Sequence, residues 1–484
     1  MANEKDNSLR DELFSAKKNG YDRISVEERV QIEDYSRGYM DFLNNARMER
    51  EAVRYAINLA ETNGFKEYES GEALQPGSKV YYNNRGKSLI LAVVGEKSLE
   101  EGCVIAGAHV DSPRLDLKQH PLYENDEMAF FRTHYYGGIK KYQWVTIPLA
   151  LHGTVALKNG DLVHVAIGHE PGEPKFVITD LLPHLAQDQM KKTMAEGITG
   201  EGLNILIGSV PYDDDGSDRV KLAVMSILHD QYGITEEDFM SAELAAVPAF
   251  PVDEIGFDRS LIGGYGHDDR VCAYAELKAL LDLEGIPART CVCILADKEE
   301  IGSDGVTGMQ SAAFEYFMAE LCAGQDVDLR HCFAKSFCLS ADVTAAFDPL
   351  YPDAFEKSND ARINYGMGIC KFTGARGKSG TSDASAEIVA YLRRTFDREN
   401  VIWQLSEMGK VDKGGGGTIA KYMANRNIDT IDAGVPVLSM HAPYEVVSKF
   451  DCYMTYKACW LSIMIPTTGS EIEHKERIPE FNLI

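Results

Sequence analysis

Four short apolar runs recur along the chain, and each has the composition of a buried strand. They carry no charged residue and are rich in small or β-branched side chains, as expected for strands that are covered on both faces. These runs are residues 103–108, 291–296, 336–341 and 436–440. They predict the strands of one buried sheet.

Helical patterns accompany these strands. In residues 47–65, Val53, Ile57 and Ala60 fall on one helical face, and Gly64 is a typical C-terminal stop. Further helices are predicted over residues 271–283, 384–394 and 452–465. Alternating strands and helices favour an α/β fold, with a mainly parallel sheet flanked by helices on both faces.

The middle of the chain has a different pattern. Between about residues 142 and 206, short segments of alternating polarity are separated by turn residues such as Asn159-Gly160 and Pro171-Gly172. This pattern is typical of an antiparallel β-rich unit. We therefore predict a β-rich insert over residues 119–246, which divides an α/β domain made of residues 1–118 and 247–484.

Composition narrows the possible partners. In 484 residues, 75 Asp and Glu outnumber 49 Lys and Arg, which gives a net charge of −26. Such an acidic chain repels nucleic acid and anionic membrane surfaces, and it has no apolar stretch of about 18 residues. Ten scattered cysteines without a CxxC pair predict a reduced, cytoplasmic protein.

Charged and imidazole side chains directly follow all four predicted strands. The first strand is followed by His109 and Asp111, the second by Asp297, Glu299 and Glu300, the third by Asp342, and the fourth by His441. Residues 266–270 (GHDDR) add a polar cluster at the start of a predicted helix. Ligands of open α/β sheets bind at the carboxyl ends of the strands, so these side chains predict one common site.

His and carboxylate ligands without Cys are typical of a catalytic zinc site. Two metal ions need a bridging carboxylate and about two further ligands each. That number is supplied by His109, Asp268, Glu300, Asp342 and His441. Glu299 is left over as a free carboxylate that could act as a general base, and Asp111 is placed to orient His109.

These motifs resemble those of the aspartyl aminopeptidase and vacuolar aminopeptidase I family of cocatalytic-zinc exopeptidases. Residues 108–118 (AHVDSPRLDLK) are similar to its first metal motif, and Tyr136-Gly137-Gly138 is similar to the segment that leads into its insert domain. The resemblance implies a zinc-exopeptidase fold, with Asp268 as the bridging ligand, Glu299 as the catalytic glutamate and Glu300 as a ligand. It also places the remaining ligands at Asp342 and His441.

The expected activity is that of a metallo-aminopeptidase, which removes the N-terminal residue from peptides with two zinc ions per subunit. Cobalt or manganese could substitute for zinc. The family resemblance suggests Asp or Glu as the N-terminal residue, and Arg376 or Lys378 would then supply the cation of that pocket. Gly417 and Thr418, at the end of a four-glycine run, suit close backbone approach of a peptide substrate.

Two other functions stay open on the sequence alone. One is a related two-zinc carboxypeptidase or deacylase. The other is a catalytically silent, metal-stabilised scaffold, which has no need of a free base such as Glu299.

The insert is expected to be the dimerisation domain. The apolar alternation of its first strands suggests a subunit contact, and the residues concerned are Trp144, Ile147, Leu149, Val155 and Leu157. The family resemblance implies that dimers join into a tetrahedral dodecamer with inward-facing active sites.

Overall fold

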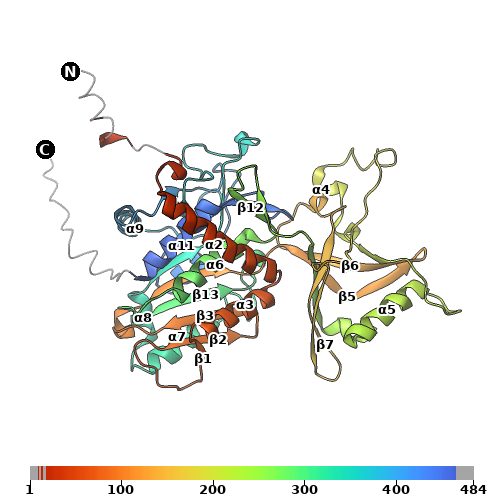
Figure 1. The fold of residues 1–484 in the computed structure, drawn as a ribbon, viewed down its shortest axis with the longest axis horizontal. Coiled ribbons are helices and arrows are strands. Elements are labelled where there is room, and N and C mark those ends of the chain that lie inside the picture. The colour runs from red at the N-terminus through yellow and green to blue at the C-terminus, as the bar shows by residue number, and fades with distance from the viewer. Residues whose placement is uncertain (1–8, 10–11, 15–17, 465–484) are drawn as a thin grey trace.

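The computed structural model describes residues 9, 12–14 and 18–464, which are arranged around three β-sheets (Figure 1). A nine-stranded sheet with its helices forms the part on the left of the view. A six-stranded sheet forms the part on the right. A five-stranded sheet lies beside the first, and the loop between two of its strands contains the predicted site residue His441.

The nine-stranded sheet is mixed, and its centre is parallel. Its strands, in spatial order, are β1 (Lys66–Glu67), β2 (Lys79–Asn84), β3 (Ser88–Val93), β13 (Cys291–Ala296), β4 (Val104–His109), β14 (Phe337–Ala341), β18 (Asp429–Gly434), β16 (Met367–Cys370) and β17 (Trp403–Leu405). The four strands from β13 to β18 run parallel. Towards the edges, β2, β3 and β16 pair in the antiparallel sense.

Successive side chains of the central strands enter two different cores, as the pleat requires. In β13, Cys293 and Leu295 face one core, whereas Val292 and Ile294 face the other. Every residue of β13 and β4 is buried. Both faces of the sheet are therefore covered, which explains why these strands are uncharged.

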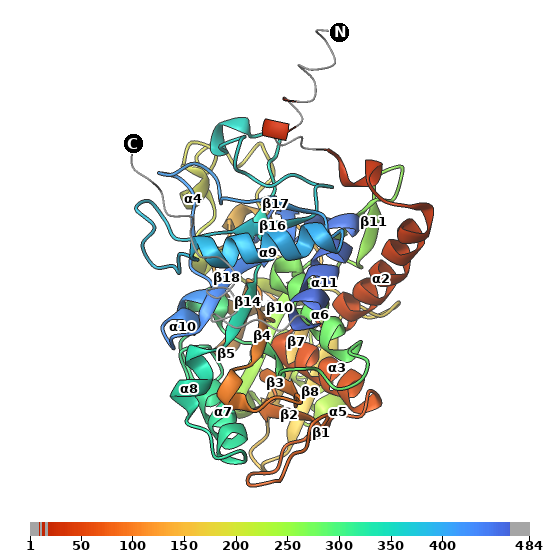
Figure 2. The ribbon, with the colours of Figure 1, turned by 90° about the vertical axis from the view of Figure 1, so that its left-hand side faces the viewer.

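Helices cover each face of this sheet (Figure 2). The first core contains side chains of α2 (Val26–Asn45), α3 (Glu49–Thr62), α6 (His267–Leu281), α9 (Ala386–Arg398) and α11 (Lys449–Met464). The second contains side chains of α7 (Ala313–Ala323), α8 (Leu329–Ala334) and α10 (Ala420–Ala424). This arrangement confirms the α/β class.

The central elements match their predicted positions closely. The predicted strand over residues 291–296 coincides with β13, and those over 103–108 and 336–341 differ from β4 and β14 by one residue. The helices predicted over 47–65, 271–283, 384–394 and 452–465 correspond to α3, α6, α9 and α11. The last predicted helical residue, Ile465, lies outside the described residues.

The second sheet contains the six strands of the β-rich segment, and all its pairings are antiparallel. In spatial order they are β8 (Leu162–Ile167), β7 (Leu149–Ala156), β10 (Ala242–Pro248), β5 (Arg114–Asn125), β6 (Met128–Tyr136) and β9 (Ile205–Gly208). The sheet begins and ends a few residues outside the predicted insert of residues 119–246. A short helix, α4 (Met194–Gly197), lies in the long connection between β8 and β9.

Helix α5 (Arg219–Tyr232) packs on this sheet and was not predicted. Its side chain Leu228 shares a core with Trp144, Leu149 and Val155, which are all fully buried. The prediction that these three residues form an exposed subunit contact is therefore wrong. Ile147 and Leu157 are partly buried against the same core.

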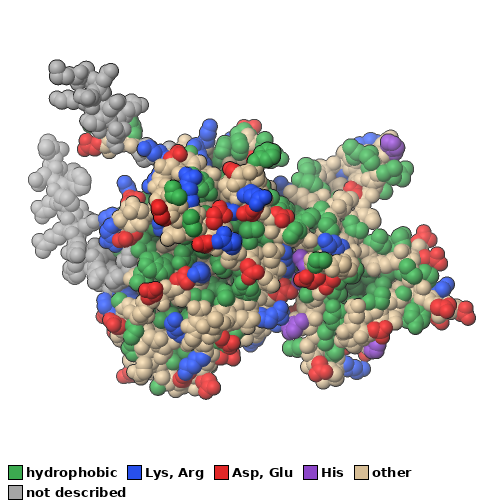
Figure 3. Space-filling view, viewed as in Figure 1, with side chains coloured by type: hydrophobic (Ala, Val, Ile, Leu, Met, Phe, Trp, Pro, Cys, Tyr) green, Lys and Arg blue, Asp and Glu red, His purple; other side chains and the backbone are tan. Residues whose placement is uncertain are grey.

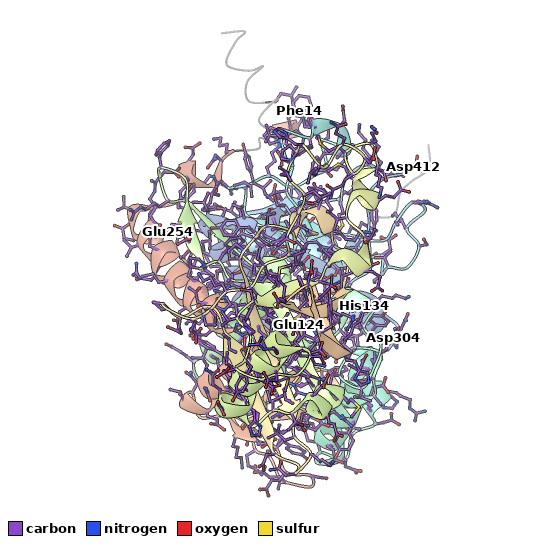
Figure 4. All side chains as sticks on the ribbon, turned by 90° about the vertical axis from the view of Figure 1, so that its right-hand side faces the viewer. Phe14, Glu124, His134, Glu254, Asp304 and Asp412 are labelled. Atoms are coloured by element: carbon purple, nitrogen blue, oxygen red, sulfur yellow. The ribbon has the colours of Figure 1, made fainter. Side chains whose placement is uncertain are left out.

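Glu124 of β5 holds the start of α5 in place. It is labelled in Figure 4, which views the molecule from the side of the second sheet. One oxygen of its carboxylate accepts hydrogen bonds from the backbone N–H groups of Val220 and Lys221, at 2.8 and 2.9 Å. The first turn of α5 has no acidic residue of its own. A carboxylate from the sheet thus satisfies the free N–H groups of the helix end.

Exposed apolar side chains gather on the long connection between β8 and β9. Figure 3 shows hydrophobic side chains on the part of the molecule that carries α4. Those exposed by half or more are Leu181, Leu182, Leu185, Met190 and Met194. Among the described residues, no helix is long and apolar enough to cross a lipid bilayer.

The third sheet has the order β11 (Asp253–Ile255), β12 (Leu261–Gly264), β20 (Glu445–Ser448), β19 (Pro436–Leu438) and β15 (Thr344–Ala345). The run predicted over residues 436–440 contains β19, so it belongs to this sheet and not to the nine-stranded one. The prediction that all four apolar runs share one sheet is wrong for this run. The chain leaves β18 at Gly434 and enters β19 two residues later, which keeps the two sheets close.

Candidate metal centre and active site

Three neighbouring strands of the large sheet deliver the first site residues. His109 is the last residue of β4, and Asp342 directly follows β14. β13 is followed by a one-turn 3₁₀ helix, Glu299–Ile301. Because β13, β4 and β14 are parallel neighbours, their carboxyl ends meet at one edge of the sheet.

Asp268 lies between two histidines. It precedes the regular part of α6, with an extended backbone at φ −76° and ψ 106°. Its Oδ1 atom is 3.2 Å from Nε2 of His109, and its Oδ2 atom is 3.2 Å from Nε2 of His441. The two oxygens of one carboxylate thus face two different imidazoles.

His441 reaches the site from a loop after β19. Both Ser439 and His441 have positive φ, at 60° and 63°, which is uncommon for residues other than glycine. The carboxylate of Glu445 holds this loop, because its Oε1 accepts a 2.7 Å hydrogen bond from the His441 N–H. Its Oε2 accepts a 3.1 Å bond from the N–H of Asp268. Glu445 therefore fixes two site residues together.

The remaining carboxylates surround the same two imidazoles. Asp342 Oδ1 and Glu299 Oε2 each lie 3.9 Å from His109 Nε2, and Glu300 Oε2 lies 3.5 Å from His441 Nε2. The structure therefore brings all five predicted ligands and Glu299 into one cluster. Glu299 is also close enough to bind an ion beside His109 and Asp342.

The electrostatics of this cluster favour bound cations. Burial, reinforced by Asp268, raises the pKa of Glu300 well above its ordinary value, and burial with Asp269 does the same for Asp342. Burial also raises the pKa of Glu299 to about 7. Oε1 of Glu300 is buried without a hydrogen-bond partner among the described residues. So many buried carboxylates need positive charge nearby.

The donor set and its spacing fit zinc. Zinc in proteins binds imidazole nitrogen and carboxylate oxygen at about 2.0–2.2 Å in tetrahedral geometry, which places two ligand atoms about 3.3–3.6 Å apart. The separations of 3.2–3.9 Å around His109 and His441 are close to this value. The residues present therefore fit the metal that the sequence predicts.

Asp111 organises the site from behind. Its Oδ1 lies 3.2 Å from Nδ1 of His109 and accepts a 3.1 Å hydrogen bond from the Glu299 N–H. Its Oδ2 accepts hydrogen bonds from the Glu300 N–H and the Tyr136 hydroxyl, at 3.2 and 2.8 Å. Burial alone would raise the pKa of Asp111, but its bonds with His109 and Tyr136 lower it. Asp111 therefore lies where it can orient His109, and this role stays a prediction.

The segment after β6 contacts the other half of the site. The carbonyl of Gly138 accepts a 2.8 Å hydrogen bond from Nδ1 of His441, which fixes the tautomer that leaves Nε2 free. A Cβ atom at Gly137 would lie 3.3 Å from Oε2 of Glu300. Gly137 also has a φ of 75°. Glycine therefore suits this position both because it tolerates a positive φ and because it has no Cβ atom to crowd Glu300.

Sequence reasoning did not assign roles to Tyr136 and Glu445. The sequence presents Tyr136 only within a motif of the family, and it gives no indication of Glu445. Both act through hydrogen bonds to residues far away in the sequence, for which a single sequence gives no signal. In the sequence Glu445 is a single carboxylate at the start of the short strand β20, which does not indicate a role.

We expect Tyr136→Phe to lower zinc affinity by about 10- to 100-fold, because it removes the hydroxyl that positions Asp111. The melting temperature of the metal-free protein should change little. Zinc affinity is measured by competition with a chelating dye. Tyr135→Phe, at the exposed neighbouring position, is the matched control. Equal affinities of Tyr136→Phe and the wild type would contradict the role of Asp111.

A cavity of about 440 Å³ opens onto this cluster. Gly417 and Thr418, for which the sequence predicts close approach of a substrate, line it together with Gly415 and Gly416. The Thr418 hydroxyl does not point to a substrate, because it donates a 2.7 Å hydrogen bond to the buried Asp432. The close approach of a substrate to the Thr418 backbone stays a prediction.

Arg376 and Lys378 do not line this cavity. They lie in a neighbouring cavity of about 140 Å³, which shares only Met408 and Gly415 with the first. Lys378 forms an ion pair with Asp383 at 3.2 Å and lies over the ring of Phe372. The expectation that these two residues supply the cation next to the metals is not met by their positions.

Comparison with known proteins agrees with this geometry. The sequence profile of the family described as aminopeptidase I zinc metalloprotease (M18) matches residues 42–460. A probable M18 family aminopeptidase 1 of Clostridium acetobutylicum is 48% identical over 453 residues, covering 92% of this chain and 97% of the relative. That of Thermotoga maritima is 42% identical over 436 residues, covering 89% and 96%.

Solved structures give the same result. The crystal structure of the M18 family aminopeptidase from Thermotoga maritima matches with a TM-score of 0.89 and 42% identity, covering 93% of this chain and 99% of that one. The crystal structure of aminopeptidase I from Clostridium acetobutylicum matches with a TM-score of 0.88 and 44% identity, covering 94% and 100%.

The fold and the site thus define a zinc metallopeptidase of the exopeptidase type. The chain belongs to the M18 family of aminopeptidases, and it is a zinc-dependent aminopeptidase. The family resemblance stated from the sequence is confirmed. A catalytically silent scaffold is no longer needed as an alternative.

Proposed function

We propose that the protein removes N-terminal residues from peptides with two zinc ions per subunit. One ion would be held by His109 and Asp342, the other by Glu300 and His441, and Asp268 would be shared. The observation that carries this proposal is the position of Asp268, whose two oxygens each lie 3.2 Å from a different histidine. A single ion would require only one of these contacts.

Zinc bound here supplies Lewis-acid activation of the scissile carbonyl and of water. Glu299 takes a proton from the attacking water and gives it to the nitrogen of the leaving amine, which becomes the new N-terminus. Its position supports this role, because it lines the cavity beside His109 and its backbone N–H is held by Asp111. Asp111 and Glu445 do no chemistry themselves and keep His109, Asp268 and His441 in place.

A two-zinc carboxypeptidase or deacylase would use a similar cluster. The free N-terminus distinguishes these activities. We expect a leucyl peptide to be hydrolysed and its N-acetylated form to be resistant. Release of the C-terminal residue, or of acetate, from the blocked peptide would contradict aminopeptidase action.

Removal and return of the metal tests the two-zinc proposal directly. The protein is dialysed against a chelator and titrated with zinc while the release of leucine and bound zinc are followed. Activity should become maximal near two zinc ions per chain. Cobalt and manganese are titrated in parallel, and we expect both to restore activity. Full activity at one ion per chain would exclude the proposed centre.

A preference for acidic N-terminal residues is proposed only from the family resemblance. Since Arg376 and Lys378 lie in the neighbouring cavity, another cation would have to recognise such a residue. A panel of peptides that differ in the first residue measures this preference. Faster release of Leu or Met than of Asp would contradict it without affecting the mechanism.

We propose that the second sheet, with residues 119–246, is the dimerisation domain, and that dimers join into a tetrahedral dodecamer. Support comes from the five apolar residues exposed between positions 181 and 194, since large apolar patches usually mark contacts. As candidates for the subunit contact, these five residues take the place of the strand residues that the sequence suggests and that are buried in the structure. Enclosed active sites would admit only short or unfolded peptides.

Light scattering should give a mass of about twelve times that of the 53.6 kDa chain, as expected for the proposed closed symmetric shell. Leu185→Glu places a charge in the exposed patch and should lower the mass to a smaller species. Phe257→Glu changes a fully exposed residue outside the second sheet and serves as the control. A mass of one or two chains for the wild type would contradict the shell.

The cytoplasm is the proposed location. All ten cysteines are buried and free of disulfides, as expected in a reducing compartment.

A further inference from the structure

The cavity above the metal cluster contains one unused cation. Lys421 is its only lysine or arginine within the described residues, and no described carboxylate forms an ion pair with it. Its Nζ lies 5.6 Å from the centroid of the Tyr422 ring. All other charged residues of the lining, apart from His441, are carboxylates of the metal cluster.

Helix α10 holds Lys421 in a fixed position. Ile419, Ala420 and Met423 are buried in the core, which turns the half-buried residues Lys421 and Tyr422 towards the cavity. At the start of this segment, the Thr418 hydroxyl is bonded to Asp432 of β18. Asp432 also accepts a 3.0 Å hydrogen bond from Ser340, two residues before Asp342. The helix is thus tied to the strand that ends at the metal cluster.

Tyr422 ties the other side of α10 to the segment of the general base. Its hydroxyl donates a 3.0 Å hydrogen bond to the carbonyl of Gly302, which directly follows the turn Glu299–Ile301. Burial and the charge of Glu299 raise the pKa of Tyr422, so this hydroxyl stays protonated. Lys421 and Glu299 line the same cavity, on two segments that this hydrogen bond ties together.

A free amine at the substrate N-terminus carries a positive charge and is repelled by Lys421, whereas a carboxylate is attracted to it. A cavity of about 440 Å³ is large enough for a dipeptide, so a substrate carboxylate can lie within reach of α10. We propose that Lys421 is a specificity residue that binds a substrate carboxylate. That carboxylate is either the C-terminus of a short peptide or an acidic side chain of the first residue. This inference rests on the proposed aminopeptidase function.

Two substrate pairs distinguish these sources. Leu-Ala and Leu-Ala amide differ in the C-terminal carboxylate, and Asp-Ala amide and Leu-Ala amide differ in the first side chain. The ratio of kcat/KM within each pair is measured for the wild type, Lys421→Met and Lys421→Arg, with bound zinc and melting temperature determined for each. Lys410→Met is the control, because Lys410 lines the neighbouring cavity.

We expect the wild type to prefer the carboxylate in at least one pair, and Lys421→Met to lose about tenfold of that preference, mainly through KM. Lys421→Arg should retain it, and all variants should bind zinc equally. The inference is overturned if the wild type discriminates within neither pair, if the preference survives in Lys421→Met, or if Lys410→Met removes it instead. It is also overturned if Lys421→Met slows all substrates alike.

Failure of the underlying function gives a different result. If no unblocked substrate is hydrolysed by the zinc-loaded wild type, the aminopeptidase proposal fails, and this inference fails with it. If all substrates are hydrolysed at equal rates, only the role of Lys421 is wrong.

Discussion

Glu299→Gln should abolish aminopeptidase activity while two zinc ions stay bound. Loss of a general base reduces rates by about 10²–10⁴-fold, and the loss here should reach the upper end because the same carboxylate also protonates the leaving amine. Glutamine keeps the size of the side chain, and the Glu299 backbone N–H still binds Asp111. Steady-state rates and metal analysis of the purified variant check both parts.

Glu300→Gln is the matched control, one residue further along the same turn. It should lose activity through loss of zinc, because Glu300 lies 3.5 Å from His441 and its other oxygen has no hydrogen-bond partner among the described residues. If Glu299→Gln were the variant that loses an ion, then Glu299 would be a ligand beside His109 and Asp342, which its 3.9 Å distance from His109 permits.

Asp268→Ala should lower zinc occupancy at both positions, to fewer than one ion per chain. The shared carboxylate faces both histidines, so its removal leaves each ion with one ligand fewer and the two ions without a bridge. Occupancy is measured by elemental analysis after dialysis against a fixed level of free zinc. His109→Ala should affect one position more than the other.

Asp269→Asn tests the assignment within the GHDDR motif. Asp269 is fully buried, and its carboxylate accepts a long 3.4 Å hydrogen bond from the His109 N–H and a hydrogen bond from the Cys272 thiol. We expect this variant to retain more zinc than Asp268→Ala. If Asp269→Asn instead retained less zinc than Asp268→Ala, Asp269 and not Asp268 would be the bridging ligand.

Much of the site could be predicted because parallel strands end at a common edge. β13, β4 and β14 are uncharged, fully buried and short, so their apolar runs and the polar residues after them were visible in the sequence. β18 was missed for the opposite reason. It contains Asp429 and Asp432, and the buried Asp432 is satisfied by Ser340 and Thr418, which no local pattern reveals.

Other errors have equally physical causes. A three-residue buried strand such as β19 has the same composition in any sheet, so its sheet could not be assigned from sequence. The apolar alternation around Trp144 suggests a subunit contact, but these side chains lie in a core that also contains Leu228 of α5, a helix that the sequence pattern does not predict. In the sequence, Arg376 and Lys378 lie between the site residues Asp342 and His441. In the structure, they line a separate cavity.

The order in which the site residues appear along the chain affects the protein during its synthesis. His109 is made early, whereas His441 follows more than three hundred residues later, and the Gly138 carbonyl that orients it comes from the segment after β6. A ribosome-bound fragment that ends before His441 therefore lacks one of the two imidazoles of the cluster, however well its first strands are folded. A chain that is still being synthesised therefore cannot cleave peptides near the ribosome. Its active site is complete only after His441, the last ligand, has been translated.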